Sequence, residues 1–349
     1  MAESIVGVDI GKGVIRAVEV INPSKPRPTL ARYHSVVIPA GAAQIGEVVE
    51  QGTVAEALKQ LWTQGGFKSK KVALGVGNQR VLVRDFSVPM MPIERIRESL
   101  PFQAQEHLPL PVAEALLDFY PISEGHGENG PILNGLLIAA VKEAVLTNVR
   151  AVQAAKLDPV EVDLIPFALS RILLGGADAR GVAAIVEIGA STSTVIVARD
   201  GVPRFVRIVQ NGSDDVNKAL VQQLGVSPEQ AEQVKRGLGL APNGYTPDWK
   251  PTIEVIFSVA SDLLANVRNT LSFWSSSRPG EPIERILLTG GGAEMPGLAS
   301  ALADVLRLPV GIPNPLERFT LARGVDTPEL RANATSVGVA AGLALGSRK

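Results

Sequence analysis

The fold of this 349-residue chain is decided by two stretches, SIVGVDIG at residues 4–11 and VAAIVEIG at residues 182–189. Each is an apolar run that ends in an acid, one further residue and a glycine, and the acids, Asp9 and Glu187, lie 178 positions apart. Each is followed by a turn and two more strand-like runs, at 14–20 and 29–38 in the first copy and at 194–201 and 203–212 in the second. The repeat predicts an internal duplication with the same β-hairpin in each half.

The composition agrees with a duplicated α/β fold. Hydrophobic residues make up 46% of the chain and aromatics only 4%, so the core must be aliphatic, as in sheets covered by helices. The length predicts two domains, or one duplicated domain with an insert. A net charge of −1 argues against a general nucleic-acid binder. Cysteine is absent, and the three histidines lack metal-ligand spacing, which disfavours zinc sites.

The segment between the two copies, residues 79–162, has a different pattern of strand-like and helix-like runs. Strand-like runs at 80–89, 115–122, 132–141 and 159–164 alternate with helix-like runs at 92–106 and 142–155, and a flexible tip is expected at 125–130. We interpret this β-α-β-β-α-β block as a small inserted α+β subdomain. The expected domains are therefore 1–181, which contains the insert, and 182–335, with a C-terminal helix at 336–349 that packs back on the first half.

The two acid-x-Gly turns suggest a pair of facing phosphate-binding loops. Glycine lets backbone N–H groups approach phosphate oxygens, and hydroxyl groups add further donors. Asp9 and Glu187, at strand ends, are candidates to hold the water shell of Mg²⁺, which takes one or two carboxylates. Two ordinary hairpins with Gly and Ser in their turns remain the alternative. The candidate phosphate-binding residues are Gly11, Lys12, Gly13, Gly189, Ser191, Thr192 and Ser193.

Two further segments fit a nucleotide site. The third glycine turn, Gly290, Gly291 and Gly292, follows an apolar strand and precedes a helix, where backbone can lie flat against a base or ribose. Glu232 and Lys235 lie three residues apart on one predicted helix face and either bracket a ribose or form an exposed ion pair. The spacing GxGxxG occurs only at 125–130, between two strand-like runs and not at a strand-to-helix turn, and GxSxG is absent. Both facts argue against a Rossmann dinucleotide site and a hydrolase elbow.

At the three glycine turns the sequence resembles the actin/Hsp70/sugar-kinase ATPase superfamily. Asp9–Gly11 resembles its first phosphate motif, Glu187–Thr192 the second and Leu288–Ala293 the adenosine motif, while Glu232 and Lys235 match the AExxK helix of bacterial actin relatives. Within the superfamily the chain is most similar to the PilM family of type IV pilus assembly proteins. Four segments carry that similarity, residues 6–20, 84–122, 162–173 and 286–302, and the second covers the insert.

The resemblance implies an actin-like, ribonuclease H-like fold, with two subdomain pairs around a cleft for ATP and Mg²⁺ and an insert placed as in FtsA. It also implies a cytoplasmic scaffold that binds the N-terminal cytoplasmic tail of a PilN-like inner-membrane protein, together with other pilus platform proteins. The most apolar stretches, 132–141 and 337–345, are shorter than the roughly 20 residues of a membrane span. Membrane attachment is therefore expected through the partner, without direct insertion.

Some residues depart from the family pattern. Glu187 stands where Asp is usual, and Lys12 stands where a small or hydroxyl residue is usual, which favours nucleotide binding over fast hydrolysis. Asp163, at the start of the connecting helix, is a candidate to orient an attacking water. Two alternatives remain open, namely a small-molecule kinase of the same superfamily and a nucleotide-free adaptor. The predicted helix of the insert carries four apolar residues, which either form the core of the insert or bind the partner's tail. They are Ile93, Ile96, Leu100 and Phe102.

Overall fold

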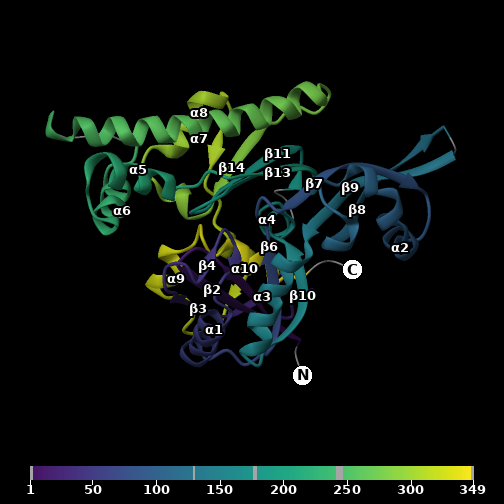
Figure 1. Cartoon of the computed structure of the whole chain (residues 1–349), viewed down its shortest axis with the longest axis horizontal. Helices are drawn as coiled ribbons and strands as arrows, with labels where there is room; N and C mark the ends of the chain where they lie inside the picture. Colours follow the sequence, from purple (N-terminus) through teal and green to yellow (C-terminus); the bar gives the residue numbers. More distant parts are fainter. Residues whose placement is uncertain (1–2, 129, 176–178, 241–246, 347–349) are drawn as a thin grey trace.

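The computed structural model describes residues 3–128, 130–175, 179–240 and 247–346. Two mixed sheets form its centre (Figure 1). The first has the order β10-β6-β1-β2-β3-β16. Its strands are β1 (Ser4–Ile10), β2 (Val14–Ile21), β3 (Thr29–Val37), β6 (Lys71–Val76), β10 (Asp158–Leu164) and β16 (Thr320–Leu321).

The second sheet repeats the central part of the first, in the order β13-β12-β11-β14-β15. Its strands are β11 (Val182–Ile188), β12 (Ser193–Arg199), β13 (Val202–Val209), β14 (Arg285–Thr289) and β15 (Val310–Gly311). Asp9 pairs with Arg16 between β1 and β2, and Glu187 pairs with Thr194 between β11 and β12, so both hairpins keep the 178-residue offset. Each leading strand has a parallel neighbour on its other side, β6 or β14. The predicted duplicated α/β fold is confirmed.

Helices lie on both faces of each sheet. Helices α1 (Gln51–Gly65) and α3 (Lys142–Ala154) cover one face of the first sheet with an aliphatic core. Helices α4 (Ile165–Leu173) and α10 (Gly338–Leu343) lie between the two sheets, and their apolar side chains share a core with strands of both (Figure 1). The outer face of the second sheet is covered by α5 (Asp214–Leu224), α7 (Lys250–Ser277) and α8 (Leu298–Leu306), with α6 (Pro228–Gly237) beside α5.

The insert carries a sheet of its own, in the order β7-β9-β8, covered by α2 (Ile93–Gln103) (Figure 1). Its strands are β7 (Val81–Pro89), β8 (Ala115–Gly127) and β9 (Gly130–Val141). Ile96 and Leu100 are fully buried in the core of the insert, with Ile93 packed against it. Phe102 is 82% exposed and Ile93 is partly buried, so of these four apolar residues Phe102 is the one with a largely exposed side chain.

Three predicted boundaries differ from the structure. The strand expected at 159–164 pairs in parallel with β6 and so belongs to the first core sheet, and α3 packs on α1 as part of the same core. The separate sheet of the insert therefore ends at Val141, before 162. The segment expected as a flexible tip, 125–130, overlaps the two hairpin strands, which stay paired as far as Gly127 and Gly130. The chain also returns to the first half before residue 335, because β16 pairs with β3. Helix α10, expected within 336–349, packs on β1, β2 and α4, while residues 347–349 lie outside the described part.

Candidate nucleotide cleft

A cavity of about 1090 Å³ opens between the two halves and collects nearly all of the predicted site residues. The β1–β2 turn lines it from the first half. The β11–β12 turn, α6 and the turn after β14 line it from the second half. The predicted residues in its wall are Asp9, Gly11, Lys12, Gly13, Glu187, Gly189, Ser191, Thr192, Glu232, Lys235, Gly290, Gly291 and Gly292.

The two hairpin turns have the same backbone hydrogen bond. The N–H of Gly11 donates to the carbonyl of Val14 at 3.0 Å, and the N–H of Gly189 donates to the carbonyl of Thr192 at 2.9 Å. Gly13 has φ of +78°, a left-handed conformation that favours glycine. Ser193 differs from its neighbours because it is fully buried and its hydroxyl donates to a backbone carbonyl at 2.7 Å. Its predicted role as a phosphate donor is therefore wrong.

The pKa values of the two acids are both raised by burial, and Asp9 also acts on Glu187. Burial raises the pKa of Asp9, and Arg16, whose Nη1 lies 3.8 Å from Oδ2 of Asp9, opposes that shift. Burial, and next the neighbouring carboxylate of Asp9, raise the pKa of Glu187 to about 8, while a hydrogen bond from Thr194 lowers it. A cation between two such carboxylates favours their charged forms.

The donor set suits a magnesium ion that arrives with its own oxygen ligands. Within residues 3–128, 130–175, 179–240 and 247–346, no group of three or more His, Cys, Asp and Glu side chains is placed to hold a metal ion. Mg²⁺ needs no such cage, since it keeps several waters and binds through one or two carboxylates plus substrate phosphates. Asp9 and Glu187 fit that requirement.

The third glycine turn is packed tightly against the acid-x-Gly turn after β11. Gly290 has φ of +85°, and a Cβ there would lie 2.5 Å from the carbonyl oxygen of Ile188 and 3.0 Å from Oε1 of Glu187. A side chain at this position would displace the acid. The N–H of Gly290 donates to the carbonyl of Thr335 at 3.2 Å, which ties the turn to the segment leading into α10.

Glu232 and Lys235 form the centre of a polar cluster in the cavity wall. Lys235 is only 8% exposed, and its Nζ lies 2.6 Å from Oε2 of Glu232. Arg236 Nε donates to Oε1 at 2.6 Å and Asn217 Nδ2 to Oε2 at 2.6 Å. Burial alone would raise the pKa of Glu232, but these hydrogen bonds hold it at about 2. The pair is therefore a fixed, charged part of the cleft rather than an exposed ion pair.

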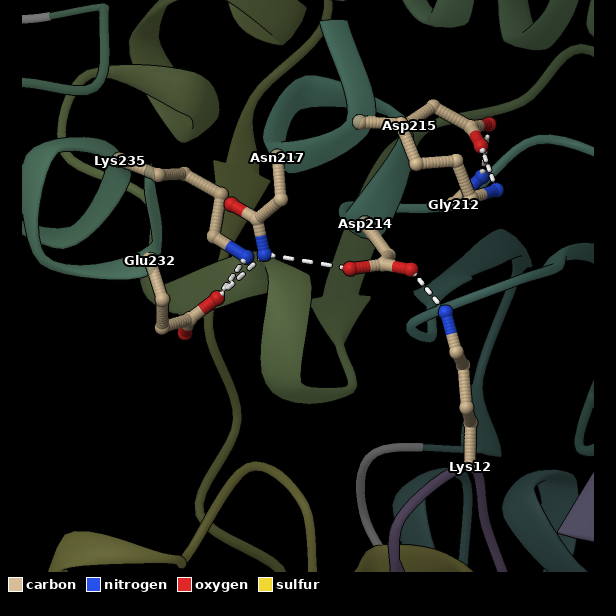
Figure 2. Close-up of polar contacts among 8 residues, drawn as sticks. Lys12, Gly212, Asp214, Asp215, Asn217, Glu232 and Lys235 are labelled. Carbon is tan, nitrogen blue, oxygen red and sulfur yellow. Dashed lines mark hydrogen bonds and ion pairs between the residues drawn. The ribbon is translucent and has the colours of Figure 1, made fainter. Parts of the chain in front are cut away.

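Figure 2 shows that this cluster continues across the cleft. The Nδ2 of Asn217 also contacts Oδ1 of Asp214 at 3.2 Å, and the other carboxylate oxygen of Asp214 accepts a hydrogen bond from Nζ of Lys12. Lys12 belongs to the first half and Asp214 to the second, so this ion pair connects the two walls.

Comparisons with known proteins agree with this architecture. Residues 7–348 match the family model of the type IV pilus assembly protein PilM. The chain belongs to this family. The solved structure of a PilM–PilN type IV pilus biogenesis complex superposes with a TM-score of 0.85 at 28% identity, over 98% of this chain and 97% of that one.

More distant relatives share the actin-like fold. The cell division protein FtsA of Bacillus subtilis (strain 168) is 22% identical over 321 residues, which cover 80% of this chain and 72% of that protein. The structure of MreB5 of Spiroplasma citri bound to ADP superposes with a TM-score of 0.53 at 11% identity, over 90% of this chain and 94% of that one. Among the described residues, no helix combines the length and the apolar character needed to cross a bilayer.

A second predicted site residue of this PilM-family chain, after Ser193, also lies outside the cavity wall. Asp163 is paired with Arg171, whose Nη2 lies 2.7 Å from Oδ2, and its Oδ1 accepts from the N–H of Leu164 at 2.7 Å. Asp163 is absent from the cavity wall, and burial raises its pKa. With both carboxylate oxygens bound within the fold, the predicted role in orienting a water is not supported by the geometry.

Sequence reasoning missed several residues of the wall. Arg16, Asp214, Asn217 and Glu294 all line the cavity. Asp214 and Asn217 lie three residues apart at the start of α5 and so share one helix face, and that spacing is a signal that could have been used. The pairing of Asp214 with Lys12 spans 202 residues and leaves no local pattern.

Proposed function

We propose that this chain is an actin-like scaffold of the type IV pilus assembly platform, whose cleft binds an adenine nucleotide, ATP with Mg²⁺, and whose surface binds the N-terminal tail of a PilN-like membrane protein. The observation that carries the nucleotide assignment is the convergence of three glycine turns and two facing carboxylates, from both halves of the chain, on one cavity of about 1090 Å³. The ADP bound to the MreB5 neighbour supports the same assignment.

Each wall of the cleft offers a distinct kind of contact to the nucleotide. The turns after β1 and β11 offer backbone N–H groups and the hydroxyls of Ser191 and Thr192 to the phosphates. Asp9 and Glu187 are placed to bind waters of Mg²⁺. The glycine turn at 290–292, where a 3-10 helix begins at Gly291, suits the adenine and ribose. The charged pair of Glu232 and Lys235 suits the ribose hydroxyls.

We infer that hydrolysis is slow. The carboxylate of Glu187 is one methylene longer than that of the aspartate usual in this superfamily, and Mg²⁺ demands near-ideal geometry. Lys12 is held by Asp214, and Asp163 is held by Arg171. The family match does not favour the small-molecule kinase alternative.

Thermal unfolding with and without nucleotide tests the cleft. ATP or ADP with Mg²⁺ at 100 times Kd should add about 2.7 kcal/mol to the free energy of unfolding, which raises Tm. Asp9→Ala should remove the Mg²⁺-dependent part of the rise and keep the part seen with nucleotide and EDTA. An unchanged Tm with ATP, ADP and a non-hydrolysable analogue would leave the nucleotide-free adaptor as the function.

Two of the sheet edges are candidates to bind the partner's tail. Strand β10 ends the six-stranded sheet and β8 ends the sheet of the insert. On β10, Val160 and Val162 are 48% and 40% exposed. The ring centroids of Tyr120 on β8 and Phe167 on α4 lie 4.6 Å apart. The insert sheet therefore contacts the helix that follows β10. We infer that the tail adds as a strand at the β10 edge, where main-chain hydrogen bonds give affinity and side-chain contacts give specificity.

This placement also bears on location. A tail bound at β10 would hold the chain on the cytoplasmic side of the inner membrane through its partner. The chain would then connect the membrane platform of the pilus machine to its cytoplasmic components.

A further inference from the structure

We propose that Asp214 is a positioning residue of the nucleotide cleft, which competes with bound phosphate for the ammonium group of Lys12. By this competition Asp214 sets the affinity for nucleotides that carry phosphates and leaves the affinity for adenosine unchanged. The inference rests on the proposed nucleotide function of the cleft.

The first observation is where the two residues lie. Lys12 stands between Gly11 and Gly13 in the first phosphate turn, so its side chain begins at the end of the cleft where the phosphates are proposed to bind. Its partner is Asp214, the first residue of α5 on the opposite wall (Figure 2). A cation that is expected to meet a phosphate is therefore already neutralised by a carboxylate of the other half.

The second observation is that Asp214 is fixed independently of Lys12. Its Oδ1 accepts a hydrogen bond from Asn217, and Asn217 is in turn bound to Glu232, which is held by Lys235 and Arg236. The side chain of Asp214 is 22% exposed and that of Lys12 is 42% exposed. Asp214 is the stationary partner, whereas Lys12 is a point charge on a flexible four-carbon stem that can turn toward a ligand.

The third point is the relative strength of the two partners. An ion pair that is partly open to solvent contributes little to stability, because water screens it and side-chain entropy opposes it. A phosphate group carries more charge and offers more acceptor oxygens than one carboxylate. Phosphate should therefore displace Asp214. Because the existing ion pair must break first, Lys12 contributes less net free energy to phosphate binding than an unpaired lysine would.

Asp215 provides a matched control on the same helix turn. Its Oδ1 accepts from Lys218 at 2.7 Å and its Oδ2 from the N–H of Gly212 at 3.1 Å, so it is satisfied locally and makes no contact with Lys12 (Figure 2). Asp215→Asn removes the same charge as Asp214→Asn without releasing Lys12. It therefore separates competition for the lysine from a general change in the electrostatic field.

The test is isothermal titration of the full chain with Mg²⁺-ADP and with adenosine. Asp214→Asn should bind ADP about fivefold more tightly than wild type, and adenosine within twofold of wild type. The gain should fall below twofold in a Lys12→Met background, and Asp215→Asn should give less than a twofold change for ADP. Thermal unfolding of each variant, with Asp214→Ser as a second substitution, checks that the fold is retained.

Several outcomes would overturn the inference. ADP binding by Asp214→Asn and Asp214→Ser that equals or falls below that of wild type would show that Lys12 is not held back. A second contrary outcome is a gain in ADP affinity that persists in the Lys12→Met background or that Asp215→Asn reproduces. Either result would mean that Asp214 acts by electrostatic repulsion of the phosphates and not by holding Lys12. In each of these cases wild type still binds ADP and the nucleotide function stands. If neither wild type nor any variant binds ADP or adenosine, the proposed function fails and this inference fails with it.

Discussion

Gly7 of β1 lies directly against the backbone of Ala340 in α10. A Cβ atom at Gly7 would lie 2.0 Å from the carbonyl oxygen of Ala340 and 2.6 Å from the backbone nitrogen of Ala344. The strand that leads into the first phosphate turn and the helix near the C-terminus are thus in backbone-to-backbone contact, and only glycine permits this distance.

Gly7→Ala should therefore destabilise the chain by about 3 kcal/mol, because the added methyl group meets backbone atoms that cannot rotate away. The measurement is the free energy of unfolding from urea titration. Gly52→Ala is the control, since Gly52 lies in the first turn of α1 and a Cβ there meets no atom within 4 Å. The control should be neutral or stabilising by up to about 1 kcal/mol. A loss below 1 kcal/mol for Gly7→Ala would contradict the close contact.

Glu19 should make the stability of the first half depend on pH. It is 2% exposed and accepts hydrogen bonds from Ser4 Oγ at 2.7 Å and Arg32 Nη1 at 2.9 Å, with the N–H groups of Lys68 and Ser69 at 3.3 Å. Burial alone would raise the pKa of Glu19, but these donors hold it below its usual value. Its stabilisation is therefore complete above the unfolded-state pKa of about 4.5 and is lost as pH falls through the lower folded-state pKa.

Glu19→Gln should cost about 2–3 kcal/mol at pH 7, because it breaks the pair with Arg32 and leaves donors unmatched. The difference from wild type should shrink in unfolding experiments below about pH 4.5. Glu56→Gln, at an exposed pair with Lys59, should change stability little at either pH. A Glu19→Gln deficit that stays constant from pH 7 to pH 3 would argue against the lowered pKa.

Glu187→Asp should raise ATP turnover if the length of this side chain limits hydrolysis. The aspartate restores the geometry usual in the superfamily, and each 1.4 kcal/mol gained in the transition state gives about a tenfold rate increase. Single-turnover phosphate release measures the rate, and nucleotide titration checks that binding is retained. A wild-type turnover of several per second, or a further loss in the aspartate variant, would speak against this explanation.

The joint substitution Val160→Lys with Val162→Lys should weaken binding of a labelled PilN-like N-terminal tail at least tenfold. Both positions are exposed on edge strand β10, where lysine opposes the addition of another strand. Val305→Lys on α8, where Val305 is 38% exposed, is the matched control and should bind as wild type does. Point substitutions are preferable to deletion of 79–162, which would also remove β10 from the core sheet. Tail affinity unchanged in the lysine variant would place the docking site elsewhere.

The parts of the cleft that were predictable from sequence are those with local signals. An apolar run followed by acid-x-Gly defines a strand and its turn within eight residues, and Asp9 and Glu187 stand in equivalent registers as the repeat predicted. The triple glycine after β14 is equally local. These patterns are visible in the sequence because the backbone conformation at each turn restricts which residues can occupy it.

The parts that were not predictable depend on long-range packing. The segment that becomes β10 has the pattern of an ordinary strand, and only its parallel pairing with β6 shows that it belongs to the core sheet. The burial of Lys235 depends on how α6 packs on α5, and the partner of Lys12 lies 202 residues away. Neither periodicity nor motif spacing contains this information.

The position of α10 also has a consequence for how the chain is made. Val18 and Val20 of β2 share a core with Ala340 and Leu343, yet the ribosome translates α10 only after the entire second half. During synthesis the face of the first sheet that packs on α10 is therefore exposed until α10 has been made. Transiently exposed apolar surface of this kind is prone to aggregation and is bound by chaperones. We expect nascent chains halted before residue 338 to be cleaved more readily in the first half than the full chain is, and the native first half to form only once α10 has left the exit tunnel.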